Sequence, residues 1–277
     1  MGQRFISLIG DSHPQFTIHA LGASPRSAGK QYIKAVNWKL PEDIPNVVSE
    51  LIVHICKPTG PFLECDVVFS GLDSDVAGEI EMAFLKANIP IFSNAKNYRR
   101  APHIPLVVPV VNTAHSTPLL ESQRQLYGLN KGFMVTNANC STTGLVVPLK
   151  ALQDKFGAFS KISVVTMQAI SGAGTGTPRK KGRLIVGYPG VPSLDILDNV
   201  VPYISGEEEK MEWETSKILG GVHIPSETGF HMPKIPVLSL RNVGSNLRCL
   251  YIVIVCLFSM DIFFPSPSHF HNSPLQQ

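Results

Sequence analysis

The chain has 277 residues, which is enough for one large domain or two of ordinary size. Its 24 basic and 21 acidic residues give a net charge of +3, which offers no argument for a nucleic-acid partner. Five cysteines without a CxxC pair argue against a zinc site, another metal centre or a disulfide framework. This cysteine usage suits a reducing compartment, so we expect a cytoplasmic protein.

Apolar runs alternate with helix-like segments in the first two thirds of the chain, which predicts an α/β domain with a mostly parallel sheet. A helix is expected at 76–88, with Ile80, Ala83, Phe84 and Ala87 on one face. Such a domain binds its ligand at the carboxyl ends of its strands. We predict strands at 16–21, 65–70, 89–92 and 106–111.

Hydroxyl and basic residues follow the first predicted strand. Arg26 lies between Ser24 and Ser27 in the segment from Ala23 to Lys30. An arginine flanked by hydroxyls would suit the 2′-phosphate that separates NADP from NAD. The same residues would also suit a polar surface turn, and in isolation the turn is the favoured interpretation.

A cysteine, Cys140, lies between the apolar runs 132–136 and 145–149 and is surrounded by small and hydroxyl residues. This pattern predicts a strand that delivers a thiol to the start of a helix. The partial positive charge of a helix N-terminus favours a thiolate, and thus a nucleophile. Asn139 and the first-turn N–H groups would hold a developing oxyanion. On spacing alone, a buried core cysteine is an equal alternative.

The range 222–277 is rich in Pro, Ser and His near its end. An apolar run at 249–260 is followed by Asp261, so it is short and interrupted for a membrane span, which needs about 20 apolar residues. We expect this range to be an unrelated and poorly ordered tail. A membrane tether through 249–264 is the weaker alternative.

Three segments resemble aspartate-semialdehyde dehydrogenases, in particular their fungal and archaeal-like branch. They are 134–157 around Cys140, 165–174 around Gln168, and 188–219, which contains Glu207 and Lys210. The resemblance covers most of 1–221. It implies an NADP-binding Rossmann-like domain at 1–139, which is incomplete at its N-terminal end, and an α+β catalytic and dimerisation domain at 140–221.

The resemblance implies an NADP-dependent oxidoreductase that interconverts L-aspartyl-4-phosphate and L-aspartate 4-semialdehyde plus phosphate. The Cys140 thiolate would displace phosphate to form a thioester, which NADPH would then reduce. The expected role is biosynthesis of lysine, threonine, methionine and isoleucine. The implied assembly is a homodimer or homotetramer that takes a small-molecule substrate.

The same resemblance gives roles to individual residues. Gln168 would orient the substrate near the catalytic Cys140. Substrate and phosphate would be bound by Asn94, Arg99, Asn139, Glu207 and Lys210. The cofactor would be bound by Ser24, Arg26, Ser27, Ser171, Gly172 and Gly174.

Each of these roles has a plainer alternative when the resemblance is set aside. Arg99 would be a solvated charge beside Arg100, and Gln168 would be a polar residue at a strand end. Glu207 and Lys210 share a helix face three residues apart, but an exposed charged first turn is the commoner meaning of such a run.

The chain departs from the family pattern in three places, so we expect a form truncated at both ends. The first strand and glycine loop expected before 1–6 are missing, and an insertion occupies 175–187. After Gly221 we find neither the Asn-Arg pair nor the Gly-His general acid/base, because His223 and His231 lie in unrelated sequence. Loss of a general acid/base costs about a hundred- to ten-thousand-fold in rate. We therefore expect little or no dehydrogenase activity.

Two other functions stay open on the sequence. One is a related thiol dehydrogenase that acts on another acyl phosphate. The glyceraldehyde-3-phosphate and N-acetylglutamyl phosphate enzymes are examples of such dehydrogenases. The other is a non-catalytic truncated paralogue that pairs with an intact subunit and regulates it.

Overall fold

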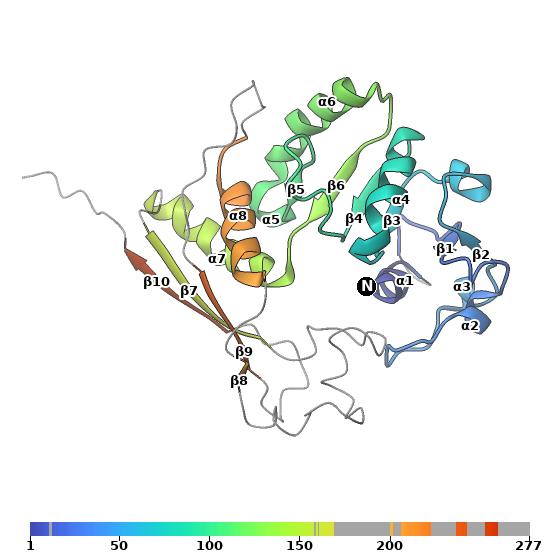
Figure 1. Ribbon diagram of the computed structural model, residues 1–277, viewed down its shortest axis with the longest axis horizontal. Helices are drawn as coiled ribbons and strands as arrows, with labels where there is room; N and C mark the ends of the chain where they lie inside the picture. The colour runs from blue at the N-terminus through green and yellow to red at the C-terminus, as the bar shows by residue number, and fades with distance from the viewer. Residues whose placement is uncertain are drawn as a thin grey trace, which may run out of the picture. The chain divides into compact units, whose positions relative to one another are not determined.

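The computed structural model describes residues 1–10, 13–157, 159, 161–168, 200–201, 206–222, 237–242 and 253–259 (Figure 1). The chain divides into two compact units. The first unit comprises Met1–Val147 with Lys210–Lys234, and the second comprises Pro148–Glu209 with Ile235–Gln277. Ser171, Gly172, Gly174 and the expected insertion at 175–187 lie outside the described residues.

A parallel sheet organises the first unit (Figure 1). Its strands run in the order β3 (Val68–Ser70), β4 (Ile91–Ser93), β6 (Met134–Asn137) and β5 (Leu106–Val107), and every pair is parallel. Because parallel strands end at the same edge, the residues that follow β4 and β6 come together there. The predicted α/β class with a parallel sheet is confirmed.

A second pair of parallel strands, β1 (Leu21–Ala23) and β2 (Val53–Ile55), also belongs to the first unit. The strand predicted at 16–21 is displaced, because pairing begins only at Leu21, opposite Val53. Phe16 instead packs edge-on against Phe69 at a centroid distance of 5.6 Å. Short helices complete this part of the chain: α1 (Gly2–Ile9), α2 (Tyr32–Ala35), α3 (Asn46–Ser49) and the 3₁₀ helix η1 (Gly60–Glu64).

The strand predicted at 106–111 ends after two residues. Pro109 begins α5 (Pro109–Asn112), where its fixed φ suits the first helical turn. The Asn112 side chain accepts a hydrogen bond from the Val108 N–H at 2.8 Å and donates to the Leu106 carbonyl at 2.9 Å, so it occupies groups that a longer strand would pair. The chain continues through η2 (Thr113–His115) into α6 (Ser116–Tyr127).

Helix α4 (Ser74–Lys86) packs on the sheet and confirms the helix predicted at 76–88, but with a different buried face. Ala77, Glu81, Phe84 and Leu85 are buried, while Ala83 and Ala87 are exposed. The polar Glu81 was not expected on this face. The surrounding core consists of Phe62, Phe84, Leu85, Ile89, Ile91, Ile104 and Met134.

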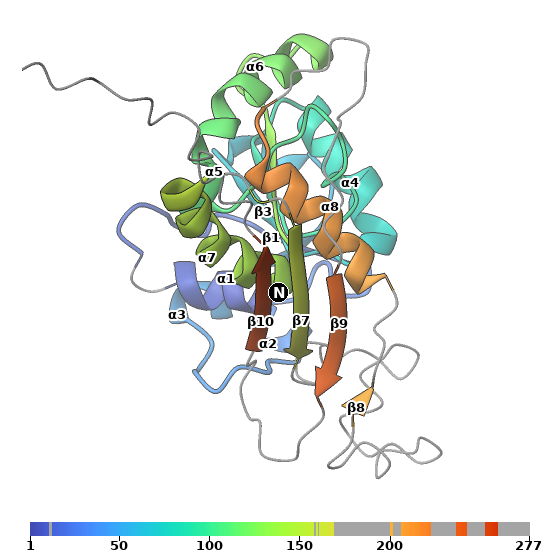
Figure 2. The same cartoon turned by 90° about the vertical axis from the view of Figure 1, so that its left-hand side faces the viewer.

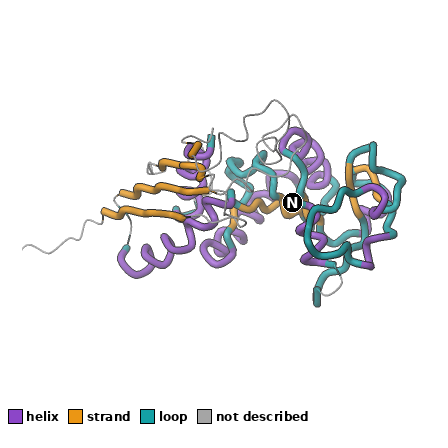
Figure 3. The backbone as a smooth tube through the Cα atoms, turned by 90° about the horizontal axis from the view of Figure 1, so that it is seen from below, coloured by secondary structure: helices purple, strands orange, loops and turns teal. Residues whose placement is uncertain are grey.

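A mixed sheet organises the second unit, with the strand order β10-β7-β9-β8. Strand β7 (Lys161–Gln168) pairs parallel with β9 (Val237–Asn242) and antiparallel with β10 (Val253–Ser259), as the arrows in Figure 2 show. Figure 3 shows the strands in orange from a third direction. β8 (Val200–Val201) pairs antiparallel with β9. Two strands of this sheet therefore come from the range 222–277 that we expected to be a poorly ordered tail.

Two long helices have residues in both units. They are α7 (Cys140–Phe156) and α8 (Glu207–Leu219). Within the described residues, no helix combines the length and the apolar character that crossing a membrane requires.

Candidate active site

Cys140 is the first residue of α7 and is exposed. It follows β6, in which Met134, Val135 and Thr136 are buried. The predicted strand, loop and helix are therefore present, and the alternative of a buried core cysteine is wrong. An exposed thiol at a helix N-terminus lies in the partial positive field of the helix dipole.

Asn139 caps the helix that begins at Cys140. Its Oδ1 accepts hydrogen bonds from the backbone N–H groups of Ser141 and Thr142, at 2.8 and 3.4 Å. Its carbonyl accepts the Thr143 N–H at 2.8 Å and the Thr143 hydroxyl at 3.0 Å. These contacts satisfy first-turn groups that would otherwise lack a partner, so two donors expected to face an oxyanion are engaged by Asn139 itself.

Arg99 is buried, with only 7% of its surface exposed. One guanidinium nitrogen, Nη1, lies 3.0 Å from Oε1 of Glu214, and Nη2 donates to the Asn94 carbonyl at 2.9 Å. Its Nε has no hydrogen-bond partner among the described residues. The alternative of a solvated charge is therefore wrong for Arg99, whereas Arg100 is exposed and stacks over the Trp213 ring at 4.9 Å.

Asn94 lies directly after β4, at the carboxyl edge of the parallel sheet. Its N–H donates to the Ser70 carbonyl at 3.0 Å, which ties it to the end of β3. Its Oδ1 accepts a hydrogen bond from the Asn137 side chain at 3.0 Å, which ties it to the end of β6. The sheet edge thus brings together Asn94, Arg99 and the residues preceding Cys140.

Sequence reasoning missed Glu214, which is fully buried in α8. Its Oε1 contacts Arg99, and its Oε2 accepts the backbone N–H of Asn139 at 2.8 Å. A signal was present, because Glu214 lies between Met211 and Ile218 on the apolar face of α8, and both of these residues are buried. A charged side chain that is buried on such a face needs a partner that pairs or hydrogen-bonds with it.

Lys217 lies on the same face of α8, three residues further on. Its ammonium group donates to the carbonyls of Arg99, Ala101 and Ile104 at 2.7, 2.9 and 2.9 Å. Three donors therefore meet three acceptors of the segment that follows Arg99. Burial lowers the pKa of Lys217 to about 8, and the Glu214 carboxylate opposes that shift.

The structure describes three more of the predicted residues. Gln168 is buried at the end of β7, and its Nε2 donates to the Thr166 hydroxyl at 3.3 Å. Glu207 and Lys210 lie in the first turn of α8, as their spacing predicted. Glu207 is only 6% exposed, so the alternative of an exposed charged turn is wrong for this residue.

The predicted cofactor residues near the N-terminus form a turn after β1. The Ser27 N–H donates to the Ser24 carbonyl at 2.9 Å, and Gly29 has a φ of 80°, which favours glycine. Ser24 and Arg26 are exposed at the carboxyl end of β1. This geometry suits a phosphate ligand and a polar surface turn alike.

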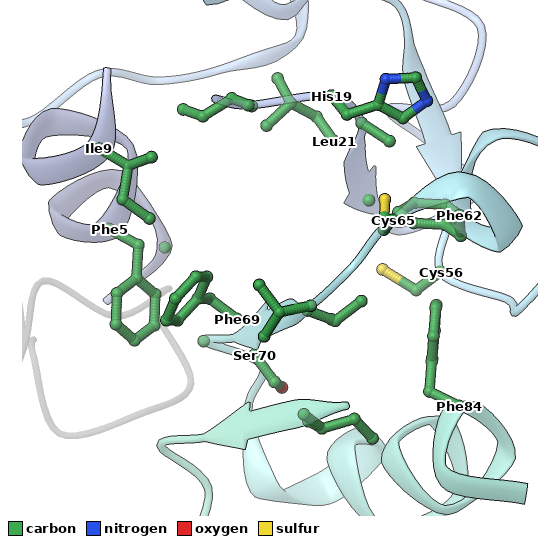
Figure 4. A pocket seen from close by; sticks show the side chains of 18 of the residues that line it. Phe5, Ile9, His19, Leu21, Cys56, Phe62, Cys65, Phe69, Ser70 and Phe84 are labelled. Atoms are coloured by element: carbon green, nitrogen blue, oxygen red, sulfur yellow. The ribbon is translucent and has the colours of Figure 1, made fainter. Parts of the chain in front are cut away.

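A cavity of about 450 Å³ lies elsewhere in the first unit, and Cys140 does not line it (Figure 4). Its lining includes Phe5 and Ile9 of α1, Leu21 of β1 and Phe69 of β3. Two half-buried thiols, Cys56 and Cys65, also line it, and burial raises the pKa of both.

Glu81 also lines this cavity. Its Oε1 accepts hydrogen bonds from the hydroxyls of Ser70 and Ser93 at 2.5 and 2.8 Å, while its Oε2 has no hydrogen-bond partner in the part of the chain that the structure describes. Burial raises the pKa of Glu81, and the two serine hydrogen bonds partly offset that effect. The part of the chain that the structure describes contains no cluster of three or more His, Cys, Asp or Glu that would hold a metal.

Two family models match the chain, one for each part of this architecture. Semialdehyde dehydrogenase, NAD binding domain, matches residues 1–117. Semialdehyde dehydrogenase, dimerisation domain, matches residues 149–240, which includes part of the range expected to be an unrelated tail. The class of protein is therefore a semialdehyde dehydrogenase, with an α/β nucleotide-binding domain and a dimerisation domain.

The chain belongs to the aspartate-semialdehyde dehydrogenase family. It is 57% identical over 237 residues to the aspartate-semialdehyde dehydrogenase of Cryptococcus neoformans, covering 84% of this chain and 60% of that protein. It is 42% identical over 280 aligned positions to that of Methanothermobacter thermautotrophicus, covering 99% of this chain and 74% of the relative.

A solved structure gives the same relationship. The crystal structure of aspartate semialdehyde dehydrogenase with NADP from Candida albicans matches with a TM-score of 0.71 at 48% identity. The match covers 87% of this chain and 64% of the Candida chain. The chain spans about three fifths of the length of the Cryptococcus relative, 60% by alignment.

Proposed function

We propose that this chain carries the catalytic cysteine of an NADP-dependent aspartate-semialdehyde dehydrogenase. The reaction interconverts L-aspartyl-4-phosphate and L-aspartate 4-semialdehyde plus phosphate. One observation carries the proposal: Cys140 is exposed at the start of α7, and its neighbour Asn139 is linked through Glu214 to the buried Arg99. This arrangement, which links the neighbour of the proposed nucleophile to a group suited to phosphate, supports the proposal.

The chemistry begins with attack of the Cys140 thiolate on the acyl-phosphate carbonyl. A carbon–sulfur bond forms, the carbon–oxygen bond to phosphate breaks, and inorganic phosphate leaves. Arg99 and Asn94 hold the phosphate, and Asn139 contributes to substrate binding. The unpaired Nε–H of Arg99 supports this role, because an anion would satisfy a buried donor. Gln168 orients the substrate, and Glu207 and Lys210 bind its polar ends.

Ser24, Arg26 and Ser27 would hold the 2′-phosphate of NADP. The exposed guanidinium of Arg26 at the carboxyl end of a parallel strand supports this fit. The nicotinamide, when bound, supplies the hydride that takes the thioester to the aldehyde. Ser171, Gly172 and Gly174 complete the proposed cofactor contacts, and the match to a structure solved with NADP supports the choice of cofactor.

We also infer the setting of the reaction. The match to a dimerisation domain supports an oligomer, which we propose to be a homodimer or homotetramer in the cytoplasm. The division into a cofactor-binding part at 1–139 and a catalytic part at 140–221 is likewise proposed. The pathway is biosynthesis of the aspartate-derived amino acids.

An assay of phosphate-dependent NADP reduction with L-aspartate 4-semialdehyde tests the proposal. Turnover that disappears in Cys140→Ser and persists in Cys65→Ser, a half-buried cysteine with no proposed role, is the expected result. Such turnover would also overturn our sequence-based expectation of low activity. Absence of turnover, with activity altered when an intact relative is mixed in, would instead favour the non-catalytic paralogue.

A further inference from the structure

Glu214 lies between two hydrogen-bond donors that belong to different parts of the first unit. Oε1 is 3.0 Å from Nη1 of Arg99, in the segment that follows β4. Oε2 is 2.8 Å from the backbone nitrogen of Asn139, in the loop between β6 and α7. One side chain therefore fixes two loops at the carboxyl edge of the sheet.

Both partners of Glu214 can only donate. A guanidinium has no acceptor, and a backbone N–H has none either. A carboxylate offers an acceptor to each of them at once. A glutamine of the same shape would turn its NH₂ group toward either Arg99 or Asn139, and the two donors would then face each other.

The contact between Glu214 and Asn139 affects the Cys140 thiol through the first turn of α7. Asn139 is held by its N–H, and its side-chain oxygen in turn holds the N–H groups of Ser141 and Thr142. These three residues flank Cys140, so the position of the thiol depends on the cap. The contact to Arg99 acts on the group that we assign to phosphate.

We propose that Glu214 is a positioning residue of the Cys140 site, which sets the start of α7 with one carboxylate oxygen and aims the Arg99 guanidinium with the other. It touches neither substrate nor cofactor in this proposal. The role of Glu214 in catalysis rests on the proposed function, but its effect on the reactivity of the Cys140 thiol does not.

The experiment compares the full chain with Glu214→Gln, and with Glu121→Gln as a matched control on the exposed face of α6. The rate of Cys140 alkylation by iodoacetamide is followed by mass spectrometry of the tryptic peptide 132–150. The tryptic peptide 40–86, which carries both Cys56 and Cys65, serves as the internal reference for an intact fold. The KM for phosphate and kcat are measured on the same samples.

Glu214→Gln is expected to slow Cys140 alkylation about two- to fivefold, because a loosened first turn weakens the helix-terminal field at the thiol. The rates at Cys56 and Cys65, and all rates in Glu121→Gln, stay unchanged. In an active enzyme, the KM for phosphate rises about threefold or more, because Glu214 no longer orients the Arg99 guanidinium.

Unchanged alkylation and an unchanged KM in a folded Glu214→Gln protein would overturn the inference, whether or not the proposed function holds. Slower Cys140 alkylation in Glu214→Gln than in wild type, together with no turnover by the wild type, would support the positioning role and contradict the proposed function. If Glu214→Gln does not fold, Glu214→Asp keeps both acceptor oxygens on a shorter stem. Slowed Cys140 alkylation in that variant supports the inference, and wild-type alkylation there overturns it.

Discussion

Asn139 shows how a single residue can serve the backbone and the proposed chemistry together. It was expected to hold an oxyanion or the substrate, and in the structure its side-chain oxygen caps α7. Neighbouring Cys140 is thereby presented at the first helical position. A substitution at Asn139 will therefore change stability as well as any activity, and the two effects need separate measurements.

Replacing Asn139 with alanine removes the acceptor for the first-turn N–H groups. We expect Asn139→Ala to lower the free energy of unfolding by about 1 kcal/mol, the usual cost of losing a helix cap. Asn139→Asp keeps an acceptor oxygen and should lose much less. Denaturant unfolding measures both variants, and equal stability of the alanine and aspartate variants would contradict the capping role.

Arg26 allows a test of the proposed cofactor preference. Its guanidinium is exposed in the turn after β1, where it would pair with the 2′-phosphate that only NADP carries. Arg26→Ala should raise the KM for NADP about tenfold or more, with the KM for NAD nearly unchanged. The control is Lys34→Ala, an exposed cation on α2. Equal effects on both cofactors would favour the surface-turn interpretation.

At the scale of elements, helix α8 brings two opposite charges into the interior of the first unit. Glu214 and Lys217 are both buried, and both contact the segment that begins at Arg99. The helix thus orders the loop that carries the proposed phosphate-binding arginine. Because hydrogen bonds satisfy both charges, removing either partner alone will cost more than removing an exposed ion pair.

Lys217 predicts a pH dependence of stability with a definite sign. Its pKa is about 8 in the folded chain and 10.5 ordinarily, so between these values the unfolded chain binds a proton that the folded chain does not. The cost of burying the ammonium is complete below pH 8 and is relieved as the pH rises toward 10.5. The contribution of Lys217 to stability therefore rises through this window.

The measurement compares wild type with Lys217→Met by denaturant unfolding at pH 7 and pH 10. The stability difference in favour of wild type should grow by roughly 1–3 kcal/mol at the higher pH. Lys86→Met, an exposed lysine of α4, is the control and should show no such growth. A difference that shrinks with pH would show that the sign is wrong.

At the scale of the whole molecule, sequence patterns predicted the elements that depend on contacts between residues close together in the sequence. The strand, loop and helix around Cys140 follow from two apolar runs and the small residues between them, and the structure has them. The helix at α4 was also predicted, although its face was misassigned because Glu81 is buried between Ser70 and Ser93. The face of α4 was predicted from its apolar residues alone, so the buried Glu81 was left out of it.

Contacts between residues distant in sequence were not predictable in this way. A run of glutamates on α8 suggests a solvated face, and nothing near Glu214 reveals that its partner is Arg99. Lys217 likewise finds its acceptors more than a hundred positions earlier in the chain. The strand at β1 begins late for the same reason, since its register is fixed by pairing with β2.

The cavity beside α1 has a consequence for solubility. Among the described strands, β1 pairs only with β2 and β3 pairs only with β4, and residues of both strands line the cavity. Unpaired strand edges invite other chains to add to a sheet, and a covering helix is one way to prevent this. Helix α1 also lines the cavity, with Phe5 against Phe69 at 5.6 Å, and we expect it to act as such a cover. Loss of its apolar side chains would therefore appear as self-association of the protein rather than as altered chemistry at Cys140.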